Sequence, residues 1–452
     1  GLGGDGGAGA GGQLAACDDT PPDTSFAATS IGQSDFPFTV PSASTAFRLT
    51  EDISVASGAA IQCSSLDDVI IDLAGYELTF GSADYGQWLV ASGCDGLEIL
   101  NGTITQGAWA GHSANIELSQ INDSIGVDLH HLTFNAHPAN TGTSRCRLID
   151  AEGLDATSTI RDSTFEIGAG DNSFGITYAF GGELYCNAIT LSGVNQNAGA
   201  YPRVFENSVS GAQFHDNAIV VDAASQEVNL WVQWGGGGVR VFRNTVDFAS
   251  AHGRFFILDS GAQDVEIFDN TFNISSTGGV VYVFRPRGSG NIDAHDNLFH
   301  HNTVDASSAT TAVQLVSIGD SQVNSRNHVY YNVLISPDLP LSFYGNAAAD
   351  TKIYCNQITH TGTSGYPFEA RGSGHSNVEL SHNRWSTARS DGVLMHLWDD
   401  VTAAPAFHLC VNEGFTDTSV VSGAFQEGDF AFSTGSCADG APSCADDAGA
   451  RP

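Results

Sequence analysis

The feature that most constrains the fold of this chain is a short motif that it repeats along most of its length. The segment from Val265 to Ile274 reads VEIFDNTFNI, and similar segments begin at Val239 and Asn377. In the regular copies an Asn stands two residues before a large apolar residue, and successive Asn residues are 24–35 positions apart. Self-similarity at this period predicts stacked units that share one continuous core. The regular positions are Asn187, Asn217, Asn244, Asn270, Asn297, Asn332, Asn356 and Asn383.

Each repeat carries a second apolar run upstream of its Asn, for example RFFILDSG from Arg254. Both runs are short, rich in β-branched and aromatic residues, and bounded by Gly, Asn, Asp and Ser, which predicts strands separated by turns. No segment shows the period of an amphipathic helix, and the units are too short for propeller blades. The sequence therefore predicts an all-β chain. We expect a right-handed, single-stranded parallel β-helix of about 12–13 coils, with a capped N-terminus and an irregular C-terminal tail.

The segment FRLTEDISVASGAAIQCSSLDDVIIDLAGYELTF, from Phe47 to Phe80, followed by the Asn-marked coils, resembles the pectin-lyase-like right-handed β-helix superfamily. The likeness covers roughly residues 40–415. It implies the fold, but no single activity, because the superfamily hosts lyases, hydrolases, epimerases, phage spikes, adhesins and plain surface proteins.

We expect three parts in the chain: a glycine-rich spacer and lead-in over residues 1–40, the β-helix over 41–415, and a C-terminal cap with a polar, Cys-containing tail over 416–452. Polar tails are ordered only where they dock, so we expect them to pack against neighbouring subunits.

Composition excludes one class of partner and favours one location. The formal net charge is −35, with 51 acidic and 16 basic residues, so nucleic acid is an unfavourable partner. No apolar stretch approaches the roughly 20 residues of a membrane span, and a lipid anchor before residue 1 stays open. Nine cysteines favour export, hence an extracellular or cell-surface location. No cofactor is assigned; the acidity leaves Ca²⁺ open, and no Cys/His spacing predicts a metal site.

Cysteine spacing predicts two disulfides. Cys63 and Cys94 are 31 residues apart, one coil length, and Cys437 and Cys444 could close a loop in the tail. Cys186 and Cys355 each precede a repeat Asn, so we expect them to be buried packing residues. Because nine is odd, one thiol is free or pairs between chains.

The Asn column has a structural interpretation. Asn tolerates the left-handed backbone region that a sharp bend requires, and stacked amides can hydrogen-bond from rung to rung. The sequence leaves open whether these side chains lie in the bend or inside the core.

A second column carries side chains suited to recognition. Aligning the upstream strands on their terminal Gly or Asp places large polar and aromatic residues one above the other. Aromatic faces stack on sugar rings and guanidinium groups bind carboxylates or sulfates, so a glycan groove is one interpretation of this column. A subunit interface is a second interpretation. Ordinary packing, with side chains that point inward or are covered by loops, is the interpretation that the sequence favours. The column residues are Trp234, Arg287, Tyr344, Arg371 and Trp398, with Arg285 and His396 two positions earlier in their strands.

No catalytic motif stands out, so catalytic residues are not assigned. We favour a non-catalytic extracellular or cell-surface protein, a self-associating rod of the filament or surface-layer type, because unpaired strand edges at the rod ends can template another chain. The alternatives are a secreted polysaccharide lyase, hydrolase or epimerase, which the superfamily resemblance implies, and a glycan-binding adhesin.

Overall fold

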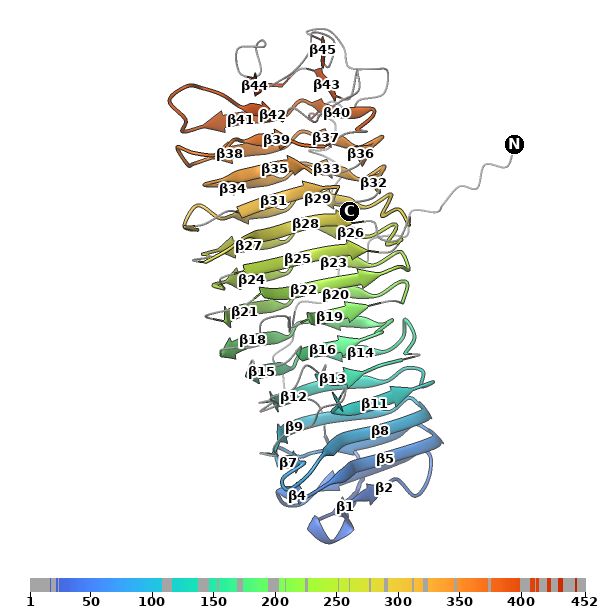
Figure 1. The fold of residues 1–452 in the computed structure, drawn as a ribbon. Coiled ribbons are helices and arrows are strands. Elements are labelled where there is room, and N and C mark those ends of the chain that lie inside the picture. Colours follow the sequence, from blue (N-terminus) through green and yellow to red (C-terminus); the bar gives the residue numbers. More distant parts are fainter. Residues whose placement is uncertain are drawn as a thin grey trace, which may run out of the picture.

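In the computed structural model, short strands stack in successive coils along one long axis and form a right-handed parallel β-helix (Figure 1). The strand pairings among the described residues are parallel from the first rungs to the last. A single short 3-10 helix, η1 (Gln33–Asp35), interrupts the strands of the described part. The predicted fold is therefore confirmed, and no helix of the described part is long and apolar enough to span a bilayer.

The structure describes the following residues: 17, 22, 24–107, 116–136, 146–152, 154–168, 174–193, 203–207, 209–223, 227–250, 252–259, 261–275, 278–287, 292–310, 313–319, 324–344, 348–372, 375–398, 407–410, 412–413, 421–423, 430–433 and 444.

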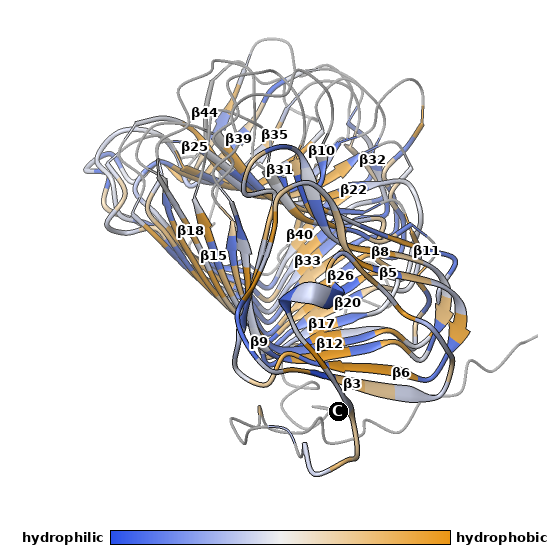
Figure 2. Ribbon diagram, turned by 90° about the horizontal axis from the view of Figure 1, so that it is seen from below, coloured by the Kyte–Doolittle hydropathy of each residue, from blue (hydrophilic) through white to orange (hydrophobic). Residues whose placement is uncertain are grey.

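Each coil contributes strands to three faces, seen end-on in Figure 2. The apolar residues of these strands form one buried core. The first face is the 16-stranded sheet: β2 (Phe38–Thr39), β5 (Gly58–Asp67), β8 (Gly86–Asp95), β11 (Ser119–Asn122), β13 (Cys146–Asp150), β16 (Phe174–Tyr178), β19 (Arg203–Asn207), β22 (Glu227–Trp234), β25 (His252–Asp259), β28 (Val281–Arg287), β31 (Val313–Ile318), β35 (Leu339–Phe343), β39 (Phe368–Ala370), β42 (Met395–Leu397) and β44 (Val421–Gly423), with β10 (Ile116–Glu117) beside β13.

The second and third faces are two ladders of the 27-stranded sheet, joined where β9 and β12 continue around the corner. The second face comprises β1 (Thr29–Ile31), β3 (Thr45–Leu49), β6 (Val69–Asp72), β9 (Glu98–Gln106), β12 (Asp128–Ala136), β14 (Thr159–Arg161), β17 (Glu183–Tyr185), β20 (Gln213–His215), β23 (Arg240–Phe242), β26 (Glu266–Phe268), β29 (Leu298–His300), β33 (His328–Tyr330), β37 (Lys352–Tyr354), β40 (Val378–Ser381), β43 (Phe407–Cys410) and β45 (Phe430–Ser433). The third face comprises β4 (Ile53–Val55), β7 (Glu77–Phe80), the ends of β9 and β12, β15 (Thr164–Gly168), β18 (Ala188–Gly193), β21 (Ala218–Ala223), β24 (Thr245–Phe248), β27 (Thr271–Ile274), β30 (Thr303–Asp305), β34 (Val333–Ser336), β38 (Gln357–His360) and β41 (Arg384–Thr387). A two-stranded sheet of β32 (Asn324–Ser325) and β36 (Ala348–Ala349) lies between β31 and β37 in the chain.

The core is a set of inward columns that continue from coil to coil. Within the first face Phe205, Trp231 and Phe256 occupy one column, with ring centroids 5.3 Å and 4.7 Å apart. All three are at least 95% buried. Burying a side chain of this size contributes roughly 1.5–3 kcal/mol. The period of the repeat is therefore the distance along the chain between successive residues of one such column.

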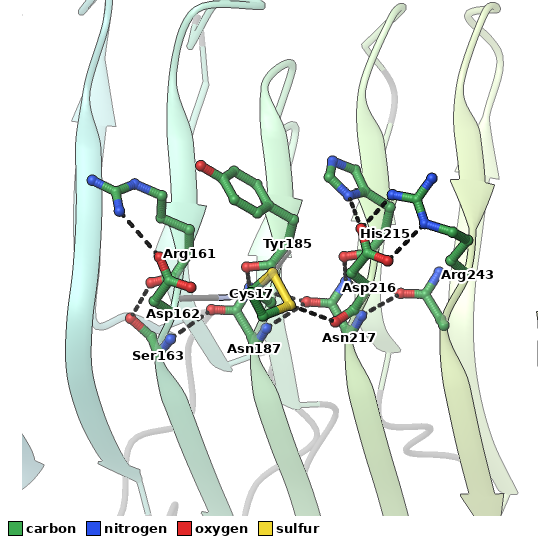
Figure 3. Close-up of a disulfide and its surroundings, with 12 residues drawn as sticks. Cys17, Arg161, Asp162, Ser163, Tyr185, Asn187, His215, Asp216, Asn217 and Arg243 are labelled. Carbon is green, nitrogen blue, oxygen red and sulfur yellow. Dashed lines mark hydrogen bonds and ion pairs between the residues drawn. A yellow bond between two sulfur atoms is a disulfide. The ribbon is translucent and has the colours of Figure 1, made fainter. Parts of the chain in front are cut away.

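The Asn column lies at the corner between the second and third faces, and its side chains point inward (Figure 3). Asn217 shows the pattern: its Nδ2 donates to Asn244 Oδ1 at 2.9 Å and to the carbonyl oxygen of Leu184 at 3.0 Å. Its Oδ1 accepts from the backbone N–H of Asn187 at 3.1 Å. The left-handed backbone belongs to the preceding residue, such as Asp216 with φ 56°. The Asn side chains therefore stabilise the bend through hydrogen bonds on its inner side. The bend itself is formed by the preceding residue, which has the left-handed backbone conformation.

One predicted member of this column is wrong. Asn270 donates to Asn302, and Asn302 donates to Asn332, so Asn302 occupies the rung assigned to Asn297. Asn297 lies instead before β29, at the corner between the first and second faces, where it donates to Asn327 at 2.9 Å. Together with Asn302, the other seven predicted Asn residues form a continuous ladder that extends to Asn412.

The disulfides correct part of the cysteine prediction. Cys63 and Cys94 are bonded as expected, between β5 and β8. Cys444 is bonded to Cys355, so the predicted loop with Cys437 does not form. Cys355 has φ 55° at the outward corner, which places its thiol at the surface, where the C-terminal segment can reach it.

A third disulfide joins Cys17 to Cys186, which also lies at an outward corner, with φ 56°. Cys186 and Cys355 are therefore anchor points for the two ends of the same chain, and the prediction that they are buried packing residues is wrong. Cys146 is a free thiol in the described part, fully buried, and burial raises its pKa to about 12.

Described residues of the lead-in contact the second face at two places. Cys17 is fixed beside β17, whereas Arg48 of β3 donates to the carbonyl oxygen of Thr24 and lies 5.1 Å from the ring centroid of Phe26. Five steps between neighbouring strands separate β17 from β3, about 24 Å at about 4.8 Å per step. The chain's own N-terminal segment is thus attached to the second face at both places.

Candidate functional site

We define the Arg–aromatic strip as Trp234, Arg285, Arg287, Tyr344, Arg371, His396 and Trp398. Strand register on the first face includes four of them, Trp234, Arg285, Arg287 and His396. Tyr344, Arg371 and Trp398 directly follow β35, β39 and β42, and their backbone N–H groups donate to the end of the strand on the preceding rung. Trp234 pairs with Asp259, which pairs with Arg287. Further along, Glu369 stands between Arg285 and His396 in the neighbouring column. Register also places two carboxylates in these columns: Asp259, which the sequence alignment had not placed there, and Glu369, which the alignment had placed two positions before Arg371.

The most exposed part of the strip lies toward its C-terminal end. Trp398 is 41% exposed, and the Arg371 guanidinium lies 5.0 Å from its ring centroid. The indole Nε1 of Trp398 donates to Glu369 Oε1. Arg371 makes no ion pair with any residue in the described part of the chain. An accessible indole face thus adjoins an accessible cation, a combination that suits a ring carrying an anionic group.

His396 extends this end of the strip sideways. Its ring stacks on Tyr366 with centroids 4.5 Å apart, and it meets Trp398 edge to face at 5.1 Å. The Arg389 guanidinium lies 4.3 Å from the Tyr366 ring centroid, and Arg389 is held by Asp391. Three rings, those of His396, Tyr366 and Trp398, therefore form one contiguous cluster with the Arg389 guanidinium.

A hollow of about 240 Å³ lies in the middle of the strip. Arg285 stands over the ring of Tyr282 on one side, 4.2 Å from its centroid. On the other side the hydroxyl of Tyr344 donates to Glu369 Oε2 at 3.4 Å. Burial, and after it Glu369, raises the pKa of Tyr344, so this phenol stays a neutral donor. The lining is Tyr282, Arg285, Gln314, Ser317, Gly319 and Tyr344.

At the N-terminal end of the strip Trp234 is more enclosed. Its Nε1 donates to Glu206 at 3.0 Å, and Arg203 donates to the same carboxylate at 2.6 Å. Arg203 also lies 5.3 Å from the Trp234 ring centroid. These three side chains satisfy one another, so this end is a structured boundary of the strip.

A related cluster continues the same columns toward the N-terminus. Arg147 donates to Asp150 at 2.8 Å and lies 3.2 Å from the ring centroid of Tyr178. Burial raises the pKa of Asp150 to about 6, against the opposing effect of Arg147. Alignment of the later strands did not reach these residues, because the coils before residue 187 carry only weak copies of the Asn motif.

Six of the 16 basic residues of the chain belong to strands β13 to β28 of this face or directly follow β39: Arg147, Arg203, Arg254, Arg285, Arg287 and Arg371. Three of them, Arg285, Arg287 and Arg371, lie in the strip. In a chain of net charge −35, these cations reduce the local repulsion that an anionic group meets.

Comparisons with known proteins give only distant matches. No family model and no curated protein matches the chain. Two solved structures are similar, both double mutants of the tailspike protein of E. coli bacteriophage HK620, one of them in complex with a pentasaccharide. Each shares 12% identity and covers 88% of this chain and 74% of the other, with TM-scores of 0.38 and 0.36. The assignment of the right-handed parallel β-helix fold rests on the strand topology described above.

Proposed function

We propose that this chain is an exported β-helical rod that binds an acidic glycan along the Arg–aromatic strip. The observation that carries the proposal is the pairing of an exposed indole, Trp398, with an exposed guanidinium, Arg371, beside the hollow that Arg285 and Tyr344 line. Aromatic faces bind the apolar face of a sugar ring, and Arg forms paired hydrogen bonds with carboxylates and sulfates.

Three disulfides support export, because such bonds persist in oxidising compartments. Glycans exposed outside cells are the ligands that an exported protein of this kind meets. We infer an extracellular or cell-surface location on this ground.

The strip supports a ligand-binding function more than the purely structural function that the sequence favours. A purely structural rod needs contacts at its ends, whereas the strip lies along one side of the rod. Both described anchor residues, Cys17 and Cys444, are bonded within this chain, so the tails need no neighbouring subunit to hold them. Self-association into a filament stays a prediction, and native particles seen by electron microscopy as single rods would contradict it.

The test is equilibrium binding to immobilised neutral, uronate-bearing and sulfated polysaccharides. We expect binding to the acidic members, weakened by salt, and about tenfold or more weaker for Arg371→Ala because a charge-assisted hydrogen bond contributes about 1.5–3 kcal/mol. Arg326→Ala is the matched control: it removes one exposed arginine from the corner between the first and second faces, outside the strip, and should bind like the native protein.

Two results would overturn the proposal. Equal loss of binding in Arg371→Ala and Arg326→Ala would show that only net charge matters. Absence of binding to every acidic glycan would remove the ligand class. Release of unsaturated uronides or new reducing ends from the same panel would instead identify the strip as the active site of an enzyme.

A further inference from the structure

A cluster of three ligand-type side chains lies on the second face, away from the strip. Asp128 of β12 pairs with Glu98 of β9 on the rung before it, and His130 follows Asp128 on the same outward side of β12. The imidazole of His130 is 96% buried, whereas the two carboxylates are about one-third and one-quarter exposed. The chain thus presents one nitrogen and two oxygen ligands at the surface, from neighbouring rungs.

Their geometry fits a small cation. His130 Nε2 lies 2.9 Å from Glu98 Oε1 and 3.8 Å from Asp128 Oδ2, and the three ligand atoms all lie within 4.8 Å of one another. Zinc–ligand bonds of about 2.0–2.2 Å arranged as a tetrahedron separate neighbouring ligand atoms by about 3.4 Å. The two distances from His130 Nε2 lie on either side of that value, so small side-chain movements would complete the geometry.

The surroundings orient these ligands. His130 Nδ1 lies 2.7 Å from His131 Nδ1, so one ring donates to the other and the His130 ring is held with Nε2 toward the carboxylates. Arg161 donates to Asp128 Oδ2 at 2.7 Å, and the Thr159 hydroxyl donates to Asp128 Oδ1. Each carboxylate oxygen has two lone pairs, so Asp128 keeps one for a cation while Arg161 fixes its position. Partners of this kind typically orient metal ligands.

We infer that Glu98, Asp128 and His130 form a binding site for a zinc-like divalent transition metal. An imidazole ligand favours Zn²⁺ and its neighbours in the series over Ca²⁺ or Mg²⁺, which prefer six or more oxygen ligands. Three protein ligands leave a fourth position for water or an anionic group. The sequence predicted no metal site, because Glu98 is separated from the other two ligands by a whole coil.

The chain contains a natural comparison for this site. Glu266, His300 and His301 repeat the same arrangement farther along the second face: His300 Nε2 lies 3.1 Å from Glu266, and its Nδ1 lies 2.9 Å from His301 Nδ1. Leu298 stands there in the position of Asp128. This second cluster therefore has the oriented imidazole and one carboxylate, and lacks the third ligand.

The experiment uses the full chain, freed of metal with a chelator and titrated with Zn²⁺ by calorimetry in excess Ca²⁺, which occupies unspecific carboxylate sites. We expect one tight equivalent. His130→Gln should lose it or bind about tenfold or more weakly, since even orienting partners of metal ligands contribute that much. Glu266→Gln, the matched control in the second cluster, should leave it unchanged. Leu298→Asp should add a second equivalent.

Absorption of the Co²⁺-loaded protein gives a second measurement that does not depend on affinity. The intense visible bands of tetrahedral Co²⁺ should appear in the native chain and be absent from His130→Gln. Native binding without these bands, or with the same affinity in His130→Gln, would place the metal elsewhere on the acidic surface and overturn the inference. Should His130→Gln fail to fold, the stoichiometry of Leu298→Asp decides: one equivalent instead of two refutes it.

Discussion

Asn244→Ala tests the role of the Asn ladder in holding the coils together. Asn244 is 99% buried in the middle of the ladder. Its Nδ2 donates to the carbonyl oxygens of Phe214 and Phe242 and to Asn270 Oδ1, at 2.9, 3.1 and 2.9 Å. Its Oδ1 accepts from the backbone N–H and the Nδ2 of Asn217, at 3.1 and 2.9 Å. One side chain therefore connects three successive rungs.

The expected loss follows from the groups left behind. In the alanine variant the backbone N–H of Asn217 loses its acceptor in a buried corner, which costs about 1–3 kcal/mol. Two carbonyl oxygens each lose one donor, and a small cavity replaces the amide, at roughly 1 kcal/mol more. We expect the free energy of unfolding to fall by about 3 kcal/mol, as measured by urea denaturation followed by circular dichroism.

Asn273→Ala is the control for this substitution. Asn273 is an exposed residue of β27 whose Nδ2 donates only to Asp247 among the described residues, at 2.8 Å. Its replacement should change the free energy of unfolding by no more than about 0.5 kcal/mol. If Asn244→Ala loses less than about 1 kcal/mol, or no more than the control, the ladder is a consequence of stacking and does not stabilise it.

Two further predictions concern the buried carboxyl group of Asp150 and the disulfide that anchors Cys17. Because the pKa of Asp150 is raised to about 6 in the folded chain, above about 3.9 for an unperturbed Asp, the native state holds more protons than the unfolded state between these values. Stability should therefore fall as pH rises from about 4 to 6, and Asp150→Asn should flatten that part of the profile in urea titrations; an unchanged profile would contradict the shifted pKa. Cys17→Ser should increase hydrogen exchange at Thr24 to Phe26 while leaving β22 and β25 protected, whereas equal protection in both proteins would show that the disulfide is not what holds the lead-in.

The fold could be predicted from the sequence because each coil must refill the same inward columns. The Asn and the apolar residue two positions later mark one fixed point in every coil, so the period predicts stacking without any knowledge of side-chain contacts. Strand ends marked by Gly or Asp hold the register closely enough to bring Trp234 and Arg287 into one column, two rungs apart.

The prediction of the Asn column failed at Asn297 because two places in the same coil have equivalent local sequence patterns. Asn297 and Asn302 both stand two residues before a large apolar residue, and both lie at corners. Only the stacking partner distinguishes them, since Asn302 continues from Asn270 whereas Asn297 pairs with Asn327. The cysteine error has a different origin: the tails have no period, so nothing in the sequence places Cys17 or Cys444 beside a particular coil.

The stacked architecture also determines what kind of ligand each face can bind. A residue on one rung meets its neighbours about 4.8 Å above and below, so a small ion is enclosed by two rungs, as Glu98 and Asp128 would enclose it. From Trp234 to Trp398 there are six steps between strands, about 29 Å, along which rings, cations and carboxylates alternate. No small molecule contacts a strip of that length, whereas an extended polymer contacts it at every rung. The second face is in part covered by the lead-in, and the strip lies on the first. The two faces therefore differ in what they can bind. The second face carries the chain's own N-terminal segment and a candidate ion site, and the first face has a surface long enough for an extended glycan.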